Sequence, residues 1–416
     1  MKQRILLIGY NFHPEPTGIG KYSGEMLHWL ARQGFACTAL TAYPYYPYWQ
    51  VQEPYVGRRF RYTTEQQSFP SGGSLRVIRC PMYVPAQPSG AKRVALDASF
   101  LLSASARLVG LLARQRFDLV IVVAPSFQFG LLGLLTQVLG RGKFLYHIQD
   151  LQIEAARDLG IIRSEKAIGA MLRLEKTILR RADYVSTISP AMVARVEQKA
   201  GRPVLLLPNW ADIAQFHPLA DRAGLKREFG FTPGQKVVLY SGAIGEKQGL
   251  EAIIHAAHHF EQVHPELQFV ICGSGPYKEK LLALTSSLGL GNVHFLPLQP
   301  LERFNAFLNM ADIHLVIQKS IASDLVMPSK LTTILAVGGV AIITADEGSG
   351  LHALVTEHGI GLLVPAENQR ALEDQLRQTL DHDYTDIRAN AQRYAEQYLS
   401  IDNIMNKFVG QVLKPA

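Results

Sequence analysis

The stretch that decides the fold class is Val237-Val238-Leu239-Tyr240-Ser241-Gly242-Ala243-Ile244-Gly245-Glu246-Lys247-Gln248-Gly249. Its first four residues are apolar on both faces, which is typical of a buried parallel strand. A glycine-rich turn follows, and after it the sequence has the periodicity of an amphipathic helix. Gly242 and Gly245 permit a close approach of the backbone to a bound group. The stretch therefore predicts one strand, loop and helix of an α/β sheet.

The same alternation of buried strands and amphipathic helices extends along the chain in both directions. We expect strands at 5–8, 37–40, 75–79, 119–123, 144–148, 184–187 and 204–207, and a second series at 237–240, 269–272, 293–296, 313–317, 341–344 and 361–364. Strands that alternate with helices indicate doubly wound α/β sheets. A chain of 416 residues is long enough for two such domains.

The boundary between the two series falls at Leu207-Pro208-Asn209-Trp210, where a strand ends in a proline turn. We expect a Rossmann-like domain at 1–208, a second at 212–385, and a C-terminal helix at 386–416 that packs back on the first domain. Open α/β sheets bind ligands at the carboxyl ends of their strands, so two such domains would face each other across a binding cleft.

Composition and charge limit the kinds of molecule that the protein is expected to bind. The net charge of +7 favours anionic partners, but no Lys/Arg tract with interleaved aromatics occurs, which argues against nucleic acid. Cys37, Cys80 and Cys272 each lie in a short apolar run and read as buried, reduced thiols. The apolar run at the N-terminus is too short for a signal peptide, and the region 94–113 contains charged residues that disfavour a membrane span. We expect a cytoplasmic protein that touches the inner membrane surface.

Two lysines in the second domain stand where a cation is unfavourable. Lys247 follows the glycine turn, and Lys330 lies in Pro328-Ser329-Lys330, with Ser329 as the expected N-cap of the next helix. A cation at a helix start opposes the helix dipole unless an anion is bound nearby. Two such lysines after corresponding strands suggest a diphosphate. A third glycine loop, Gly273-Ser274-Gly275, follows the next strand.

The first domain has two candidate loops of its own. The loop before its first helix contains Gly18-Ile19-Gly20-Lys21, which either places backbone N–H groups against an anion or forms a plain tight turn. The strand at 144–148 ends in His147-Ile148-Gln149-Asp150, which places a histidine and an aspartate at the carboxyl edge. His147 is either a functional residue or a hydrogen-bonded structural histidine.

Taken together, these loops resemble those of the retaining GT-B glycosyltransferases of family 4, and the resemblance covers nearly the whole chain. Its nearest branch is similar to the WcaI-type colanic acid biosynthesis glycosyltransferases. The strings that carry it are Gly18-Ile19-Gly20-Lys21-Tyr22, Tyr45-Tyr46-Pro47-x-Trp49-Gln50, His147-Ile148-Gln149-Asp150, Pro208-Asn209-Trp210, Ser241-Gly242-x-Ile244-Gly245-Glu246-Lys247-Gln248-Gly249-Leu250 and Pro328-Ser329-Lys330-Leu331-Thr332.

The resemblance implies a role for each loop. The diphosphate of the donor would be held by Gly242, Gly245, Lys247, Pro328, Ser329 and Lys330, and the nucleoside would be framed by Gly273, Gly275 and the segment 296–299. His147 would touch the donor sugar, with Asp150 beside it, and Gly18 and Gly20 would close over the reacting centre. Many family members carry two glutamates eight positions apart. Here Thr333 occupies the second position and Leu325 the first, so Asp324 is expected to replace the first glutamate.

The expected activity is transfer of a sugar, with retention of configuration, from a nucleoside diphosphate to a polyprenyl-diphosphate-linked oligosaccharide in exopolysaccharide biosynthesis. The resemblance favours GDP-fucose as the sugar donor. We expect no metal and no cofactor besides the nucleotide sugar. Two alternatives stay open: a sugar-nucleotide epimerase of the same fold, and a non-catalytic partner of another transferase. The segment 91–117 is either an interfacial helix at the membrane or a core helix against the sheet.

Overall fold

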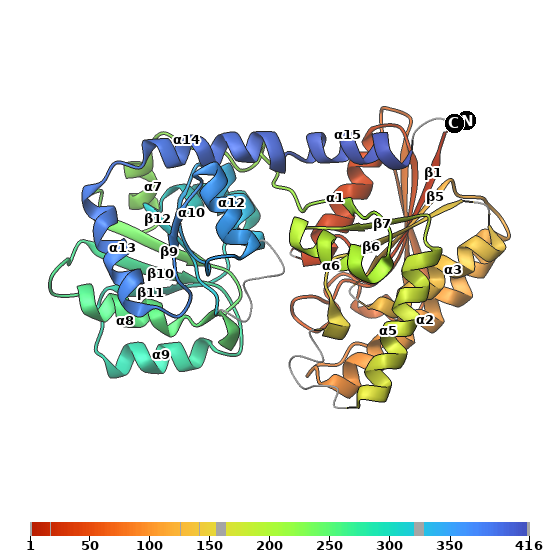
Figure 1. Cartoon of the computed structure of the whole chain (residues 1–416), viewed down its shortest axis with the longest axis horizontal. Helices are drawn as coiled ribbons and strands as arrows, with labels where there is room; N and C mark the ends of the chain where they lie inside the picture. Colours follow the sequence, from red (N-terminus) through yellow and green to blue (C-terminus); the bar gives the residue numbers. More distant parts are fainter. Residues whose placement is uncertain are drawn as a thin grey trace. The chain divides into compact units, whose positions relative to one another are not determined.

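The computed structural model describes residues 2–16, 18–124, 126–140, 142–154, 164–319 and 328–413. The chain divides into two compact units (Figure 1). The first consists of Met1–Pro208 with Met405–Ala416, and the second of Asn209–Ile404. The last helix runs from the second unit into the first.

The first unit is built on one eight-stranded sheet with the order β3-β4-β2-β1-β5-β6-β7-β8. Its elements are β1 (Arg4–Ile8), α1 (Gly18–Arg32), β2 (Ala36–Ala42), β3 (Thr63–Ser68), β4 (Ser74–Cys80), α2 (Gly90–Leu112), β5 (Leu119–Ala124), α3 (Gly130–Leu139), β6 (Lys143–Ile148), α5 (Glu165–Arg181), β7 (Tyr184–Thr187), α6 (Pro190–Ala200) and β8 (Leu205–Leu206). All neighbouring strands are parallel except β3 and β4.

The centre of this sheet follows from its sequence. Ile5, Leu6, Leu7 and Ile8 of β1 are all fully buried, because helices cover both faces of a parallel strand. The chain passes from β1 to β2 and β4 on one side and then returns to β5 on the other. This reversal creates a switch point between β1 and β5, where open α/β sheets bind ligands.

The second unit repeats this architecture on a six-stranded parallel sheet with the order β11-β10-β9-β12-β13-β14, which is the doubly wound Rossmann order. Its elements are α7 (Arg222–Glu228), β9 (Lys236–Ser241), α8 (Glu251–Phe260), β10 (Leu267–Cys272), α9 (Lys278–Ser287), β11 (Val293–Leu296), α10 (Leu301–Asn309), β12 (Ile313–Val316), α11 (Ser329–Ala336), β13 (Val340–Thr344), α12 (Gly350–His358), β14 (Leu362–Val364), α13 (Gln369–Asp381) and α14 (Thr385–Tyr394). The switch point lies between β9 and β12.

Alternate residues of β9 feed two separate cores in this unit. Val237 and Leu239 pack with side chains of α10, α11, α12 and α14. Val238 and Tyr240 face the other way and pack with side chains of α8, α9 and α13. Figure 1 shows these two helical layers on opposite sides of the sheet. The expected doubly wound α/β class is therefore confirmed.

Two local expectations were wrong, and one strand was not predicted. The expected helix over the C-terminal region is interrupted: after α14 the backbone forms a π-turn at Ala395–Leu399, Ser400 is extended, and α15 (Ile401–Val412) then begins. Sequence patterning missed β3, whose residues are all polar. Ser329 is the first helical residue of α11 rather than its N-cap, and no side chain caps that helix.

Helix α2 lies in the segment that was expected either at the membrane interface or against the sheet. By length and composition alone it could cross a membrane, a test that a core helix of a soluble protein also passes. In the structure, Leu96, Phe100, Ala104, Leu108 and Leu111 are buried. Their spacing forms one continuous stripe along the helix, which is the pattern of a surface helix packed on a core by a single face.

Candidate functional site

The loops that follow β9 and β10 pack directly against each other. Gly242 N–H donates to Cys272 O at 2.9 Å, and Ile244 N–H donates to Ser274 O at 2.9 Å. A Cβ atom at Gly273 would collide with the carbonyl oxygen of Gly242, and one at Gly275 would collide with that of Ile244. Gly242 and Gly275 also have positive φ values of 155° and 158°. These glycines therefore join the two loops into one backbone surface at the carboxyl edge.

The turn after Gly245 differs in detail from the expected helix start. Residues Glu246–Gln248 form one 3-10 turn, and α8 begins only at Glu251. Gly245 N–H donates to Gln248 Oε1 at 3.1 Å, so a side chain within the loop caps this turn. Lys247 lies in the turn, while its side chain is outside the described part of the structure.

Lys330 reaches the same surface from α11. Its Nζ lies 3.6 Å from the centroid of the Tyr240 ring, in cation–π geometry. An added Cβ at Gly242 would stand 2.9 Å from this Nζ, so the lysine rests against the glycine loop. Burial lowers the pKa of Lys330 to about 7, because desolvation disfavours the ammonium form. The structure thus brings Gly242 and Lys330 together.

Ser329, Pro328 and Thr333 are the other residues expected to bind the donor at the start of α11. Ser329 is exposed and Pro328 is half-buried. Thr333 Oγ1 donates to Lys330 O at 3.0 Å, which engages its hydroxyl proton within the helix. Asp324, the expected substitute for a glutamate, lies outside the described residues.

Sequence reasoning missed Lys319, which follows β12 at the switch point. Lys319 Cγ would lie 3.4 Å from a Cβ placed at Gly249, whose φ is 65°. The lysine thus borders the loop after β9. The signal was present, because Lys319 stands just beyond a buried strand, but only the strand order places that strand beside β9.

His147 lies on β6 of the first unit and is almost completely buried, with 1% exposure. Its Nε2 is 2.9 Å from Gln149 Nε2, and its Nδ1 is 2.9 Å from Ser186 Oγ. Since the Gln149 amide nitrogen only donates, Nε2 accepts and Nδ1 carries the proton toward Ser186. Burial lowers the pKa of His147 to about 4, so the ring is neutral at pH 7.

Of the remaining expected residues of this unit, Gly18 and Gly20 lie at the start of α1 and Asp150 follows β6. Gly18 begins α1 with a φ of 61°, and Asp150 is exposed after β6. A Cβ on Gly20 would collide with the carboxylate of Glu15. The missing side chain at Gly20 thus makes room for a buried acid.

Glu15 is a second residue that sequence reasoning missed. Its Oε1 accepts hydrogen bonds from the backbone N–H groups of Tyr45 and Tyr46, and its Oε2 accepts one from Asn11 Nδ2. Burial raises the pKa of Glu15 to about 7 despite these donors. Asp97 on α2 also has a pKa raised by burial, to about 6. Buried carboxyl groups with raised pKa values, such as Glu15 and Asp97, are candidates for proton transfer.

Side chains that commonly ligate metals are dispersed in the part of the chain that the structure describes. No group of three or more His, Cys, Asp or Glu side chains suited to a metal occurs among those residues. The sequence does contain one Asp-x-Asp, at Asp381 and Asp383, between α13 and α14. Asp383 Oδ1 accepts from Thr385 N and Oγ1 at 3.0 and 2.7 Å, so it caps the start of α14.

Comparison with known proteins agrees with this architecture. Residues 17–210 match the model of the glycosyl transferase 4-like domain, and residues 221–398 match that of glycosyl transferases group 1. The chain is 40% identical to the putative colanic acid biosynthesis glycosyl transferase WcaI of Escherichia coli K12, over 98% of this chain and 99% of that protein.

Solved structures share the fold at low sequence identity. Sucrose-phosphate synthase from Thermosynechococcus elongatus has a TM-score of 0.74 and 19% identity, covering 99% of this chain and 98% of its own. Anabaena HepE in complex with UDP-glucose has a TM-score of 0.67 and 16% identity, covering 99% of this chain and 100% of its own.

Fold, glycine loops and family models together define a nucleotide-sugar-dependent glycosyltransferase of the GT-B fold. Within that class, the 40% identity extends over nearly the full length of both chains. The chain belongs to family 4 of the GT-B glycosyltransferases, in the colanic acid biosynthesis group that includes WcaI.

Proposed function

We propose that this enzyme transfers fucose from GDP-fucose to a polyprenyl-diphosphate-linked oligosaccharide on the cytoplasmic side of the inner membrane. The observation that carries the donor half is Lys330, a lysine with a depressed pKa held against the glycine loop at the switch point of a Rossmann-type sheet. A diphosphate at this edge would supply the missing counter-ion. HepE, of the same fold, was solved with UDP-glucose, which supports a nucleotide sugar as donor.

In this proposal the second unit stabilises the leaving diphosphate. Negative charge grows on the phosphate oxygens as the bond to the sugar breaks, so donors aimed at that position lower the barrier. Lys330, Lys247 and the backbone around Gly242 and Gly245 are the proposed donors, with Ser329 and Pro328 at the start of α11. Gly273 and Gly275 frame the nucleoside. The acceptor hydroxyl attacks from the same face and gives its proton to the leaving phosphate, which retains configuration, and no metal takes part.

The first unit contributes the sugar side of the proposed reaction. His147 is neutral and its Nδ1 proton is directed at Ser186, so it would act by positioning and hydrogen bonding rather than as a cation. Asp150 and Asp324 are proposed to contact the sugar, and Thr333 the nucleotide. Gly18 and Gly20, at the start of α1, are proposed to close over the reacting centre.

The acceptor half of the proposal rests on the surface of α2 and α3, two helices in contact in the first unit. Leu102 on α2 is 73% exposed and Val138 on α3 is 80% exposed, and both helices carry further exposed apolar side chains. Lys92 and Arg116 lie exposed at or beyond the two ends of α2. An apolar face with basic ends suits an interfacial helix on anionic lipid, where a lipid-linked acceptor presents its sugar.

A binding screen tests the donor assignment. Thermal unfolding is measured with GDP, UDP and ADP and with their sugar conjugates, because a ligand at 100 times its dissociation constant stabilises the folded state by about 2.7 kcal/mol. We expect GDP and GDP-fucose to raise the Tm most. A larger shift with UDP or UDP-glucose would overturn GDP-fucose as donor, and no shift with any nucleotide would overturn the donor site itself.

A further inference from the structure

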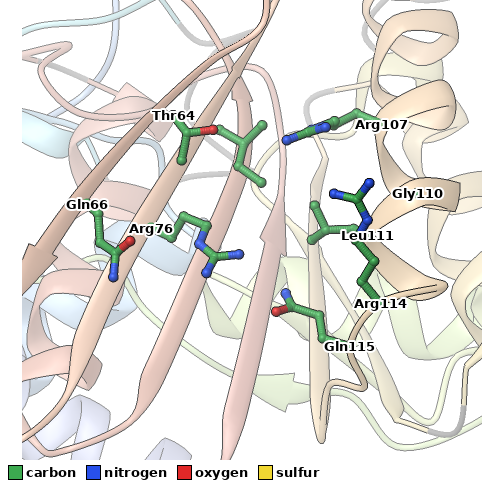
Figure 2. Close-up of a pocket in the computed structure, with 9 residues that line it drawn as sticks. Thr64, Gln66, Arg76, Arg107, Gly110, Leu111, Arg114 and Gln115 are labelled. Carbon is green, nitrogen blue, oxygen red and sulfur yellow. The ribbon is translucent and has the colours of Figure 1, made fainter.

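A strongly basic pocket lies in the first unit, between the β3–β4 hairpin and the C-terminal end of α2 (Figure 2). Its volume is about 290 Å³. Thr64, Gln66 and Arg76 line it from the hairpin, and Gln66 is the direct cross-strand partner of Arg76. Because side chains alternate along a strand, Glu65 points to the opposite face and contacts Arg79 there, with 3.5 Å between Oε1 and Nε.

The helix supplies two more guanidinium groups and an opening between them. Arg107 and Gly110 are three residues apart on one face of α2, and Arg114 follows the C-terminus of the helix; all three line the pocket. Gly110 lacks a side chain, and a Cβ placed there meets nothing within 4 Å. Figure 2 shows Arg76 on its strand, Arg107 on α2 and Arg114 just beyond α2, around the same space.

The pocket carries positive charge that no negative charge in its lining balances. No carboxylate lines it, and none of the three arginines forms an ion pair with another residue in the described ranges. Arg107 Nε is buried and has no hydrogen-bond partner among those residues. A favourable contact with the helix dipole accounts for Arg114, which follows the C-terminus of α2, but not for Arg76 or Arg107. An anion would satisfy the buried Nε and relieve the repulsion.

We propose that this pocket binds a phosphate group, held by Arg76, Arg107 and Arg114, at a site separate from the donor loops of the second unit. Guanidinium groups match phosphate oxygens with paired N–H donors, and Thr64, Gln66 and Gln115 add neutral donors. The phosphate comes either from a lipid headgroup, to which the exposed Leu102 and Val109 of the same helix are suited, or from free phosphate. The inference does not depend on the proposed donor or acceptor.

Calorimetry on the full chain at fixed ionic strength tests this site. The probes are dihexanoylphosphatidylglycerol, inorganic phosphate, and dihexanoylglycerol as the phosphate-free control. We expect Arg107→Gln to weaken binding of the phosphate probes at least about tenfold, as for a lost charged hydrogen bond. Gly110→Leu should block the pocket without removing charge. Arg32→Gln, an exposed arginine at the C-terminus of α1 and outside the lining, should change binding less than twofold.

The possible outcomes distinguish a lipid phosphate, a free phosphate and the absence of a specific site. Lipid binding lost in Arg107→Gln and Gly110→Leu but kept in Arg32→Gln supports the site and a lipid source, whereas binding of inorganic phosphate alone supports the site with free phosphate as its ligand. Equal weakening in Arg32→Gln would show diffuse surface attraction and overturn the proposal, as would the absence of binding by either phosphate probe. Thermal unfolding of each variant confirms folding, and Gly110→Leu carries the test if Arg107→Gln is unstable.

Discussion

Lys330 Nζ stands 3.6 Å from the centroid of the Tyr240 ring, at the end of the first strand of the second sheet. The contact ties the start of α11 to the end of β9. Because burial lowers the pKa of Lys330 to about 7, the free enzyme near neutral pH holds this side chain partly uncharged. A bound diphosphate would restore the charge, so binding and protonation should be coupled.

The first prediction concerns that coupling. Nucleoside diphosphate binding near pH 7.5 should take up protons, measured by calorimetry in buffers that differ in ionisation enthalpy. Lys330→Ala should abolish the uptake and weaken binding by about 1.5–3 kcal/mol, the range for a charged hydrogen bond. Lys236→Ala, at the exposed amino end of β9, serves as the matched control. Proton uptake that persists in Lys330→Ala would assign it to another group.

The second prediction tests the contact between the glycine loops. Gly273→Ala should destabilise the protein by about 1–3 kcal/mol, because the new Cβ collides with a backbone carbonyl and forces the loop to shift. The shift should also weaken nucleoside diphosphate binding. Gly234→Ala is the control, since a Cβ there meets nothing within 4 Å. Similar urea midpoints and affinities for the two variants would contradict the close approach.

The third prediction follows from the buried, neutral His147. Its pKa of about 4 lies below the unfolded value of 6.5, so the unfolded state binds more protons between these values. The stability contributed by the neutral ring is therefore complete above pH 6.5 and is lost as the pH falls toward 4. His147→Asn should be less stable than wild type at pH 8, and urea unfolding should show the difference shrink by about 2 kcal/mol at pH 5. A difference that is constant with pH would mean that the histidine is not held neutral.

The fourth prediction tests membrane docking through α2 and α3. Arg93 stacks on Trp49 and Arg114 lines the basic pocket, which leaves Lys92 and Arg116 as the basic residues to exchange. Binding to anionic liposomes at low salt should fall at least about tenfold in Lys92→Glu/Arg116→Glu, since each basic residue near such a surface adds about 1 kcal/mol. The control, Lys236→Glu/Arg370→Glu, makes the same charge change in the second unit. Sedimentation that is equal for both variants would place docking elsewhere.

Sequence patterning predicted most of the fold because the central strands are apolar on both faces. The runs at Ile5–Ile8 and Val237–Tyr240 can satisfy that composition only inside a parallel sheet. Strand β3 escaped prediction because it lies at the sheet edge, where pairing with β4 and not burial holds polar residues in place. The break at Ser400 escaped it because the helical periodicity continues on both sides.

Site residues could be predicted where a local sequence pattern marks them. Gly242 and Lys330 could be inferred because glycine turns and early helical lysines are local signals. Lys319 and Glu15 could not, because their significance depends on neighbours that the strand order and the chain's turns bring close. In the sequence Glu15 is an ordinary loop acid. Only the fold places the N–H groups of Tyr45 and Tyr46 against its carboxylate.

The most direct test of the account is transfer itself, measured with purified enzyme, radiolabelled GDP-fucose, GDP-mannose or UDP-glucose, and a polyprenyl-diphosphate-linked oligosaccharide. We predict label in the lipid fraction from GDP-fucose, only with acceptor present, and with the anomeric configuration of the donor kept. Transfer from a different donor would correct the sugar and leave the reaction class in place. Conversion of the nucleotide sugar without acceptor, or no transfer from any donor, would contradict the central claim.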